Sequence, residues 1–431
     1  MTAGVGPPGA ALTPHSRARS VPLTAMVPSR PTHRSRPAGT RRSLPVALAV
    51  VGLALAGCAD FSAEAPTFTV QPSLTARAAV PQDPTPGTPP STSPSSESGS
   101  PPSSGSTPPA DPCAPTDEAV IATCLSAPWG LAPLPGGGSA LVGERTTGRI
   151  LKVAKGAEPQ LVAQIDGVDG TGDGGLLGLA LSPSYAEDGL LYAYVTTAED
   201  NRIIRIAAGD VPKAIFTGIP KGATHNGGRI AFGTDRSLYV GTGDTGNPAL
   251  AGDPASLAGK VLRLDEFGKP AGTNPTPGSA VFATGFTQPT GLCPLPDGTM
   301  AALDDRTPAD VLLPLSAGRN YGTLAEGDAL WTWTAADGGA VSCAVAGSVL
   351  ASTSLDKQQL TGLQLAGPRT FTGSPTVLLD NRYGRLLTVV PDSTGLLWLT
   401  TSNKDGQGQP VPSDDRVIVV PSDGGGEGGL D

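Results

Sequence analysis

Beyond residue 112 the chain alternates between short apolar runs and turns rich in glycine, proline and aspartate. The pattern is clear in SALVGERTTGRILKVA (139–154), RSLYVGTGD (236–244) and DDRVIVVP (414–421). Apolar runs of about four to eight residues bounded by such turns are typical of β-strands. Long segments with the spacing of an amphipathic helix are scarce, so the pattern predicts an all-β domain.

One strand–turn–strand unit recurs along this region. Each copy has a small or apolar strand, a turn with Gly, Pro or Asp, and a second apolar strand that leads to a polar end. Propeller blades repeat at about 40–50 residues, and each blade is a four-stranded sheet. Residues 113–421 therefore predict a six-bladed β-propeller, whereas a pair of β-sandwiches would not explain the recurrence. The copies are PWGLAPLPGGGSALVGE (128–144), LLGLALSPSYAEDGLLYAYV (176–195), NGGRIAFGTDRSLYVGTGD (226–244), PTGLCPLPDGTMAALDD (289–305) and LLTVVPDSTGLLWLTTS (386–402).

The N-terminus has the features of a bacterial export signal. A basic region without acidic residues precedes the apolar run LPVALAVVGLALAG, which is followed by Cys58. The run is shorter than a comfortable membrane span and is typical of a signal peptide, and LAGC (55–58) resembles a lipobox, whose cysteine becomes lipidated. We expect residues 1–57 to be removed and Cys58 to anchor the chain to the outer face of the cell membrane. An uncleaved anchor helix is the alternative, and Met26 is a second candidate start.

Residues 58–112 are expected to form the lipidated N-terminus and a tether. From residue 78 onward this segment consists almost entirely of Pro, Ser, Thr and Gly. Such a composition buries too little apolar surface to offset chain entropy. The glycine-rich tail 422–431 is expected to be flexible for the same reason.

The charge of the chain excludes one class of partner. The formal net charge is −9, and loss of residues 1–57, which carry seven arginines and no acidic residue, would change it to −16. An acidic exported domain is poorly suited to nucleic acid or to an anionic lipid surface. We therefore expect no nucleic-acid partner.

Four cysteines remain besides Cys58. Outside the cytoplasm an even number most simply forms disulfides, and we expect the pairs Cys113–Cys124 and Cys293–Cys343. The first pair would pin the entry strand of the domain. No two of the four have CxxC spacing, so a zinc site is not expected.

Several stretches together carry a resemblance to a known family. They are GGLLGLALSPSY (174–185), HNGGRIAF (225–232), GTGDTG (241–246), LAGKVLRLD (257–265), GRNYG (318–322) and SNKDGQGQPVPSDDRVI (402–418). In this order and spacing, over most of residues 125–421, the chain resembles the soluble aldose sugar dehydrogenases that depend on pyrroloquinoline quinone (PQQ), the glucose/sorbosone dehydrogenase family. That family consists of six-bladed propellers.

The resemblance implies a sugar-oxidising activity with His225 as its base. The family moves a hydride from the anomeric carbon of a sugar to PQQ, whose carbonyl is polarised by Ca²⁺ and cationic side chains. A base must take the hydroxyl proton, and a neutral imidazole suits that task. His225 occupies the base position of the family's HxGGR motif and is the only histidine outside residues 1–57. The motif's glycines are expected to let the backbone approach a ligand, and Arg229 to anchor the loop or a cofactor carboxylate. By itself, a lone histidine in a glycine-rich turn is most often an ordinary turn residue.

The chain departs from the family pattern at positions that would hold the anionic quinone. The family's GxRNPxGL is GFTQPTGL here, so Thr287 and Gln288 stand where an Arg-Asn pair faces the cofactor. Loss of the arginine removes a charged hydrogen bond typically worth about 1.5–3 kcal/mol, although Gln288 keeps a neutral donor. The family's RxR is reduced to Arg385. Asp173 replaces a Glu or Gln and is expected to touch a substrate hydroxyl.

Metal and sugar contacts have weaker candidates. The family's calcium segment is altered to DDRTP, in which Asp304 and Asp305 could supply carboxylate ligands to Ca²⁺. Packing between blades is the favoured role for the tryptophans, and Trp331 and Trp333, which follow a long loop, are the better candidates for stacking on a sugar. Asp244, in the GTGDTG turn, fits plain turn chemistry better than calcium binding.

Three functions fit these observations. The first is an extracytoplasmic, lipid-anchored, PQQ-dependent sugar dehydrogenase, which HNGGR favours. The second is a non-catalytic propeller that binds a cell-envelope glycan or protein after loss of the cofactor site, which TQPT and DDRTP favour. An envelope structural or assembly lipoprotein is the third. We adopt the first and retain the second as the alternative.

Overall fold

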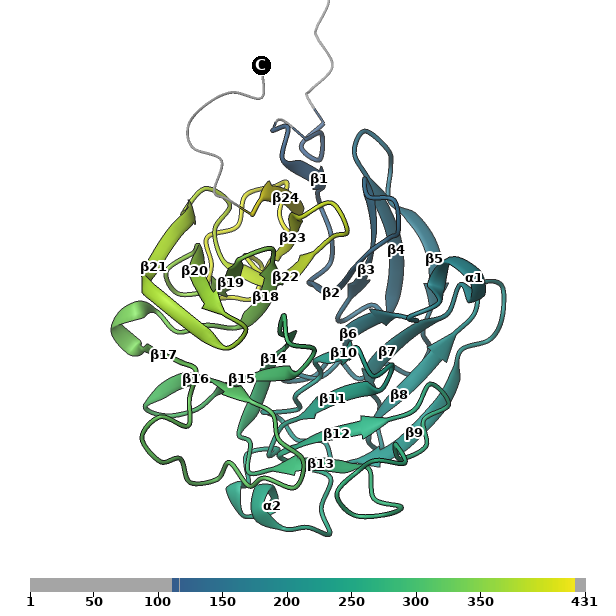
Figure 1. The fold of residues 1–431 in the computed structure, drawn as a ribbon. Helices are drawn as coiled ribbons and strands as arrows, with labels where there is room; N and C mark the ends of the chain where they lie inside the picture. Colours follow the sequence, from purple (N-terminus) through teal and green to yellow (C-terminus); the bar gives the residue numbers. More distant parts are fainter. Residues whose placement is uncertain (1–110, 116, 423–431) are drawn as a thin grey trace, which may run out of the picture. The chain divides into compact units, whose positions relative to one another are not determined.

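The described part of the chain forms six four-stranded antiparallel sheets arranged as blades around an axis (Figure 1). The computed structural model describes residues 111–115 and 117–422. The innermost strands of successive blades contact one another in a closed ring, in the order β2, β6, β10, β14, β18, β22 and back to β2. The predicted all-β, six-bladed propeller is confirmed. The expected signal peptide, Cys58, nearly all of the tether and the tail from residue 423 onward lie outside the described residues.

Each of the first five blades takes its strands from one continuous stretch of sequence, running outward from the channel. Blade 1 contains β2 (Pro128–Pro133), β3 (Ser139–Glu144), β4 (Arg149–Ala154) and β5 (Gln160–Gln164), and blade 2 contains β6 (Leu176–Leu181), β7 (Leu191–Thr196), β8 (Asn201–Ile206) and β9 (Lys213–Ile219). Blade 3 contains β10 (Ile230–Phe232), β11 (Leu238–Thr242), β12 (Lys260–Leu264) and β13 (Val281–Thr284), and blade 4 contains β14 (Gln288–Pro294), β15 (Met300–Asp305), β16 (Ala309–Pro314) and β17 (Trp331–Thr334). Blade 5 contains β18 (Ser342–Ala346), β19 (Val349–Ser354), β20 (Gln359–Gly367) and β21 (Thr370–Asp380), and blade 6 contains β22 (Leu386–Pro391), β23 (Leu396–Thr401), β24 (Val417–Pro421) and β1 (Val120–Ala122). The connections contain two short helices, α1 (Tyr185–Asp188) and α2 (Pro248–Gly252), and the 3₁₀ turn Ala335–Asp337. No helix among the described residues is long and apolar enough to cross a membrane.

The blades pack because their middle strands are apolar on both faces. In β7, Ala193 and Val195 enter the core shared with blade 1, whereas Tyr192 and Tyr194 enter the core shared with blade 3. Successive strand residues point to opposite faces, so one strand serves two inter-blade cores. This explains why the repeats read as nearly continuous apolar runs instead of alternating ones.

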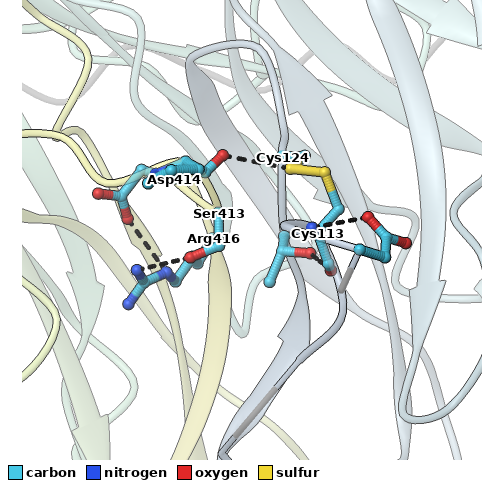
Figure 2. The surroundings of a disulfide bond; sticks show 8 residues. Cys113, Cys124, Ser413, Asp414 and Arg416 are labelled. Carbon is cyan, nitrogen blue, oxygen red and sulfur yellow. Dashed lines mark hydrogen bonds and ion pairs between the residues drawn. A yellow bond between two sulfur atoms is a disulfide. The ribbon is translucent and has the colours of Figure 1, made fainter. Parts of the chain in front are cut away.

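Blade 6 closes the ring by joining the two ends of the domain. β1 precedes the first blade in sequence, yet it pairs with β24, with Val120 opposite Ile418. Beyond β1 the Cys124 and Leu125 amides donate to carbonyls of Ser413 and Asp415, both at 3.0 Å. Figure 2 shows the Cys113–Cys124 disulfide beside this segment. Both predicted disulfides are confirmed, and the second, Cys293–Cys343, links the innermost strands of blades 4 and 5.

The closure generates a first prediction, which concerns stability. The Cys113–Cys124 bond spans a sequence separation of 11. Replacing both residues by serine should lower the free energy of unfolding by about 2–3 kcal/mol, because the unfolded chain regains the freedom of a short loop. The measurement is denaturant unfolding of the full chain.

The second disulfide provides the comparison. Cys293–Cys343 spans a separation of 50, so serine at both positions should cost more, about 4 kcal/mol on the same loop-entropy scale. An unchanged unfolding midpoint after loss of the Cys113–Cys124 bond would show that strand pairing alone closes the ring.

Candidate functional site

Polar residues at the starts of three neighbouring innermost strands form one cluster. Asp173 precedes β6, His225 precedes β10, and Gln288 begins β14. Hydrogen bonds join the three positions across blades 2, 3 and 4. We call Asp173, His225, Asp244, Thr287 and Gln288 the His225 cluster.

His225 is held in an unusual backbone conformation. Its φ is +55°, in the left-handed region that few residues other than glycine adopt. Its N–H donates to Asp173 Oδ2, and its carbonyl accepts from the Thr245 amide at 3.1 Å. Backbone strain of this kind persists where surrounding contacts over-determine it, and it often accompanies a functional site.

The imidazole is oriented by a buried carboxylate. Nδ1 lies 2.8 Å from Asp244 Oδ1, and the His225 side chain is 38% exposed whereas that of Asp244 is 2% exposed. Asp244 Oδ1 also accepts from the Gly246 amide at 2.8 Å. An ionised carboxylate only accepts, so the neutral imidazole carries its proton on Nδ1 and leaves the Nε2 lone pair free. In the part of the chain that the structure describes, Nε2 has no hydrogen-bond partner.

Asp173 clamps the loop that carries the histidine. Besides accepting from the His225 amide, it accepts from Asn226 Nδ2 through its other oxygen. Asn226 is itself buried and bonded to Gly222 and Asn201. The carboxylate predicted to touch a substrate hydroxyl thus has a positioning role, and any substrate contact would use its remaining lone pairs.

The motif's two glycines serve packing inside the protein. Gly227 and Gly228 have φ values of +72° and +109°, and a Cβ on Gly227 would lie 2.4 Å from the Gly241 carbonyl oxygen. On Gly228 it would lie 2.5 Å from the Leu177 side chain. The two glycines therefore let the histidine loop lie close to strands β11 and β6. The expectation that they let the backbone approach a ligand is not what these contacts show.

Arg229 points into the central channel instead of toward the His225 cluster. Its Nε donates to the Thr290 carbonyl at 2.6 Å and its Nη1 to Thr388 Oγ1 at 2.9 Å. The guanidinium lies over the indole of Trp129, 3.9 Å from the ring centroid. The prediction that Arg229 anchors the loop fits these contacts, but they do not place it as a ligand of a cofactor carboxylate.

The Thr287 backbone and the Gln288 side chain both bond to blade 3. The Thr287 carbonyl accepts from the Asp244 amide at 2.8 Å, and Gln288 Oε1 accepts from the Gly227 amide at 3.0 Å. The two residues thereby tie blade 4 to the histidine loop. Gln288 Nε2 remains as a donor at this face.

The surroundings of Asp304 differ from those expected of a calcium ligand. It is fully buried, accepts from the Thr287 and Gln288 amides, and forms an ion pair with Arg306. Arg306 Nε lies 2.8 Å from its Oδ2. A carboxylate occupied by a guanidinium and two amides holds the turn and leaves little for a metal ion.

Asp305 faces a second carboxylate. Burial and the Asp305 carboxylate raise the pKa of Asp310 to about 7, and Asp310 also accepts from the Ala340 amide at 2.9 Å. No cluster of three or more His, Cys, Asp or Glu side chains suited to a metal occurs among the described residues. The carboxylates of the described residues thus do not fit the calcium site predicted from Asp304 and Asp305.

Trp331 and Trp333 lie away from the channel. Both are on β17, the outermost strand of blade 4. Trp333 is buried in the core between blades 4 and 5, and Trp331 packs edge-on against Phe371 at 6.3 Å between ring centroids. Packing between blades, the alternative to sugar stacking, is what the structure shows.

Two cations flank the cluster. Arg385 precedes β22 and is ion-paired with Asp405, its Nε 2.8 Å from Oδ2. Arg145 was not identified from the sequence; its Nη1 donates to the carbonyls of Gly172 and Gly174, on both sides of Asp173, at 2.9 and 2.8 Å. Within the described residues Arg145 forms no ion pair at bonding distance, although the nearby Asp173 carboxylate attracts its charge.

Asp244 was also missed as a partner of the histidine, although a signal existed. The β10–β11 hairpin pairs Ile230 with Val240. When the same pairing is extended past the ends of the two strands, the residues before β10 lie beside those after β11. Asp244 then lies near His225. The GTGD turn alone suggests only a turn residue.

Comparisons with known proteins agree on one family. A sequence model described as "Glucose / Sorbosone dehydrogenase" matches residues 125–325. The PQQ-bound aldose sugar dehydrogenase of Streptomyces coelicolor is 39% identical, with a TM-score of 0.66, over 70% of this chain and 95% of that one. A putative oxidoreductase (glucose dehydrogenase) of Thermus thermophilus is 34% identical, with a TM-score of 0.64, over 70% and 98%.

Curated relatives match more distantly. The aldose sugar dehydrogenase of Escherichia coli K12 is 27% identical over 48% of this chain and 62% of its own length. Quinoprotein glucose dehydrogenase B of Acinetobacter calcoaceticus is 27% identical over 42% and 46%. The chain spans about half the length of the curated relatives it matches.

The clamp on the histidine loop generates the second prediction. Asp173→Ala should lower the free energy of unfolding by about 1–3 kcal/mol, because the His225 amide and the buried Asn226 amide group lose their acceptor. Urea unfolding of the full chain measures the change. Asp166→Ala, at an exposed aspartate of the preceding loop, is the matched control, and equal stability of the two variants would contradict the clamp.

The third prediction concerns the pH dependence of stability and follows from the raised pKa of Asp310. Between the ordinary value of 3.8 and about 7, the unfolded chain releases a proton that the folded chain keeps, so this group makes stability fall as pH rises. Asp310→Asn should flatten the pH dependence of urea unfolding in this window. A profile identical to that of the unmodified protein would show that Asp310 is ionised in the fold.

Proposed function

Because the chain belongs to the glucose/sorbosone dehydrogenase family, we propose that it is an oxidoreductase that oxidises the anomeric hydroxyl of a sugar with PQQ. The observation that carries the proposal is the partly exposed imidazole of His225, which Asp244 holds and whose Nε2 has no partner among the described residues. This is the arrangement that a general base for a hydroxyl group requires.

The proton transfer uses two side chains of this protein. His225 Nε2 accepts the proton of the sugar hydroxyl, and the imidazole becomes positively charged. The buried Asp244 carboxylate, 2.8 Å from Nδ1, stabilises that charge and keeps the ring in the productive tautomer. The left-handed conformation of His225 sets the direction of the ring and is maintained by Asp173.

Cofactor binding would use the donors at the same face. When bound, PQQ supplies a quinone carbonyl carbon that takes up the hydride. The donors present suit its carboxylates: Gln288 Nε2, the Arg145 guanidinium and the ion-paired Arg385. The donor-rich face fits an anionic quinone, whereas the described carboxylates do not fit calcium, so we assign no step to that ion.

We further propose that the enzyme acts outside the cytoplasm. The apolar run of residues 44–57 and LAGC support a signal peptide and a lipidated Cys58. The tether of residues 58–112 would then connect the propeller to the membrane. The substrate proposed is a small sugar or an envelope glycan.

One observation favours a second candidate function. Thr287 and Gln288 carry no charge, and the nearby Arg306 is neutralised by Asp304. A propeller with a weakened cofactor site would still present this face to a cell-envelope glycan or a protein. The alternative is therefore a non-catalytic binding lipoprotein.

Titration of PQQ separates these functions and is the fourth prediction. Calorimetry on the full chain, with and without Ca²⁺, should show saturable binding of PQQ, and dye-coupled assays should show oxidation of aldoses. His225→Gln should lower kcat by about 10²–10⁴ because the base is lost, while the affinity for PQQ is retained. Asp244→Asn should also lower kcat, by about 10² or more, because it no longer fixes the tautomer.

A matched variant controls for changes in the loop. Asp253→Asn alters an exposed aspartate at the C-terminal end of α2 and should leave kcat unchanged. Absence of PQQ binding at high micromolar cofactor would contradict the dehydrogenase proposal and support the binding lipoprotein.

A further inference from the structure

The channel contains a cavity at the half opposite to the His225 cluster. Its volume is about 460 Å³, and residues of all six innermost strands line it. No member of the His225 cluster is among the lining residues. Most of the wall is apolar, with contributions from Leu131, Leu181, Phe232, Pro294, Val345 and Pro391.

A single charged residue lines this cavity. Arg229 is 9% exposed, and every other lining residue is uncharged. In the described part of the chain it forms no ion pair: its three acceptors are the Thr290 carbonyl, the Thr388 hydroxyl and, at 3.4 Å, the Val341 carbonyl. Burial accordingly lowers the pKa of Arg229 to about 9. A buried cation without a counter-ion is costly, and an anion would relieve that cost.

The guanidinium is fixed before any ligand arrives. One face lies over the Trp129 indole, 3.9 Å from the centroid. Thr388, which accepts from Nη1, donates its own proton to the Trp129 carbonyl at 2.8 Å. The bonds to Thr290, Thr388 and Val341 use three of the five guanidinium N–H groups. One N–H on Nη1 and one on Nη2 remain. Two donors on neighbouring nitrogens match the two oxygens of a carboxylate.

A neighbouring hydroxyl adds a donor. Ser342 lines the cavity, and its Oγ accepts from the Val389 amide at 3.2 Å. Its own proton is therefore available to another acceptor. With one cation and one hydroxyl among apolar walls, the cavity is suited to one negative charge and poorly suited to the two of a phosphate.

We propose that this half of the channel binds a small monocarboxylate with an apolar body. The carboxylate is held by the free donors of Arg229 and by Ser342, and the body lies against the aliphatic and proline wall. The site uses no residue of the proposed catalytic face, so its ability to bind a ligand does not depend on the dehydrogenase function.

Benzoate and its neutral isostere benzamide test this inference on the full chain. Calorimetric titration should give one benzoate per protein with a dissociation constant in the millimolar range or lower, and benzamide should bind at least about tenfold more weakly because it carries no charge. Quenching of tryptophan fluorescence near Arg229 provides a second readout.

Variants locate the binding. Val345→Trp should fill the cavity and abolish benzoate binding, whereas Val345→Ala, which leaves the space open, should retain it. His225→Gln should bind benzoate as the unmodified protein does, which separates this test from that of the catalytic face. The proposal is overturned if benzoate shows no saturable binding, if benzamide binds equally well, or if Val345→Trp leaves the affinity unchanged.

Discussion

The centre of the molecule depends on the contacts of one guanidinium, that of Arg229, which is buried in the central channel. Arg229 leaves blade 3 and reaches an indole of blade 1, a carbonyl of blade 4, the carbonyl that precedes blade 5 and a hydroxyl of blade 6. The glycine before it accepts from the Gly178 amide of blade 2 at 3.0 Å. The segment HNGGR therefore meets every blade, which requires two glycines because any side chain there would collide with neighbouring strands.

This arrangement divides the channel into two chemically different halves. On one side the same segment presents His225, with its ring held by Asp244 and its strained backbone held by Asp173. On the other side lies a largely apolar cavity with one unpaired cation among the described residues. Backbone strain of order 1–3 kcal/mol at the histidine is tolerable because the surrounding hydrogen bonds leave the loop no alternative conformation.

The fold could be predicted from sequence more fully than the site. The blade period is a local signal, so six blades could be predicted. The even number of cysteines predicts disulfides without fixing the pairs, and the two pairs that were expected are those in the structure. Arg145 could not be found, because its contacts lie across loops between blades. The sequence does not show that the strand of Trp333 is the outermost of its blade. Nor does it show that Arg306 folds back onto Asp304, two residues before it.

The proposed role of His225 as base depends on the orientation of its imidazole, which nitrogen NMR reports directly. The chain has three histidines, of which His225 is the only one among the described residues, so the signals that disappear in His225→Gln identify its ring nitrogens in ¹⁵N-labelled full-length protein, and Asp244→Asn serves as the reference. We predict a ring whose neutral form is protonated at Nδ1, with a free Nε2, and a mixture of tautomers in the Asp244→Asn variant. A ring protonated at Nε2, or averaged equally in both proteins, would contradict it.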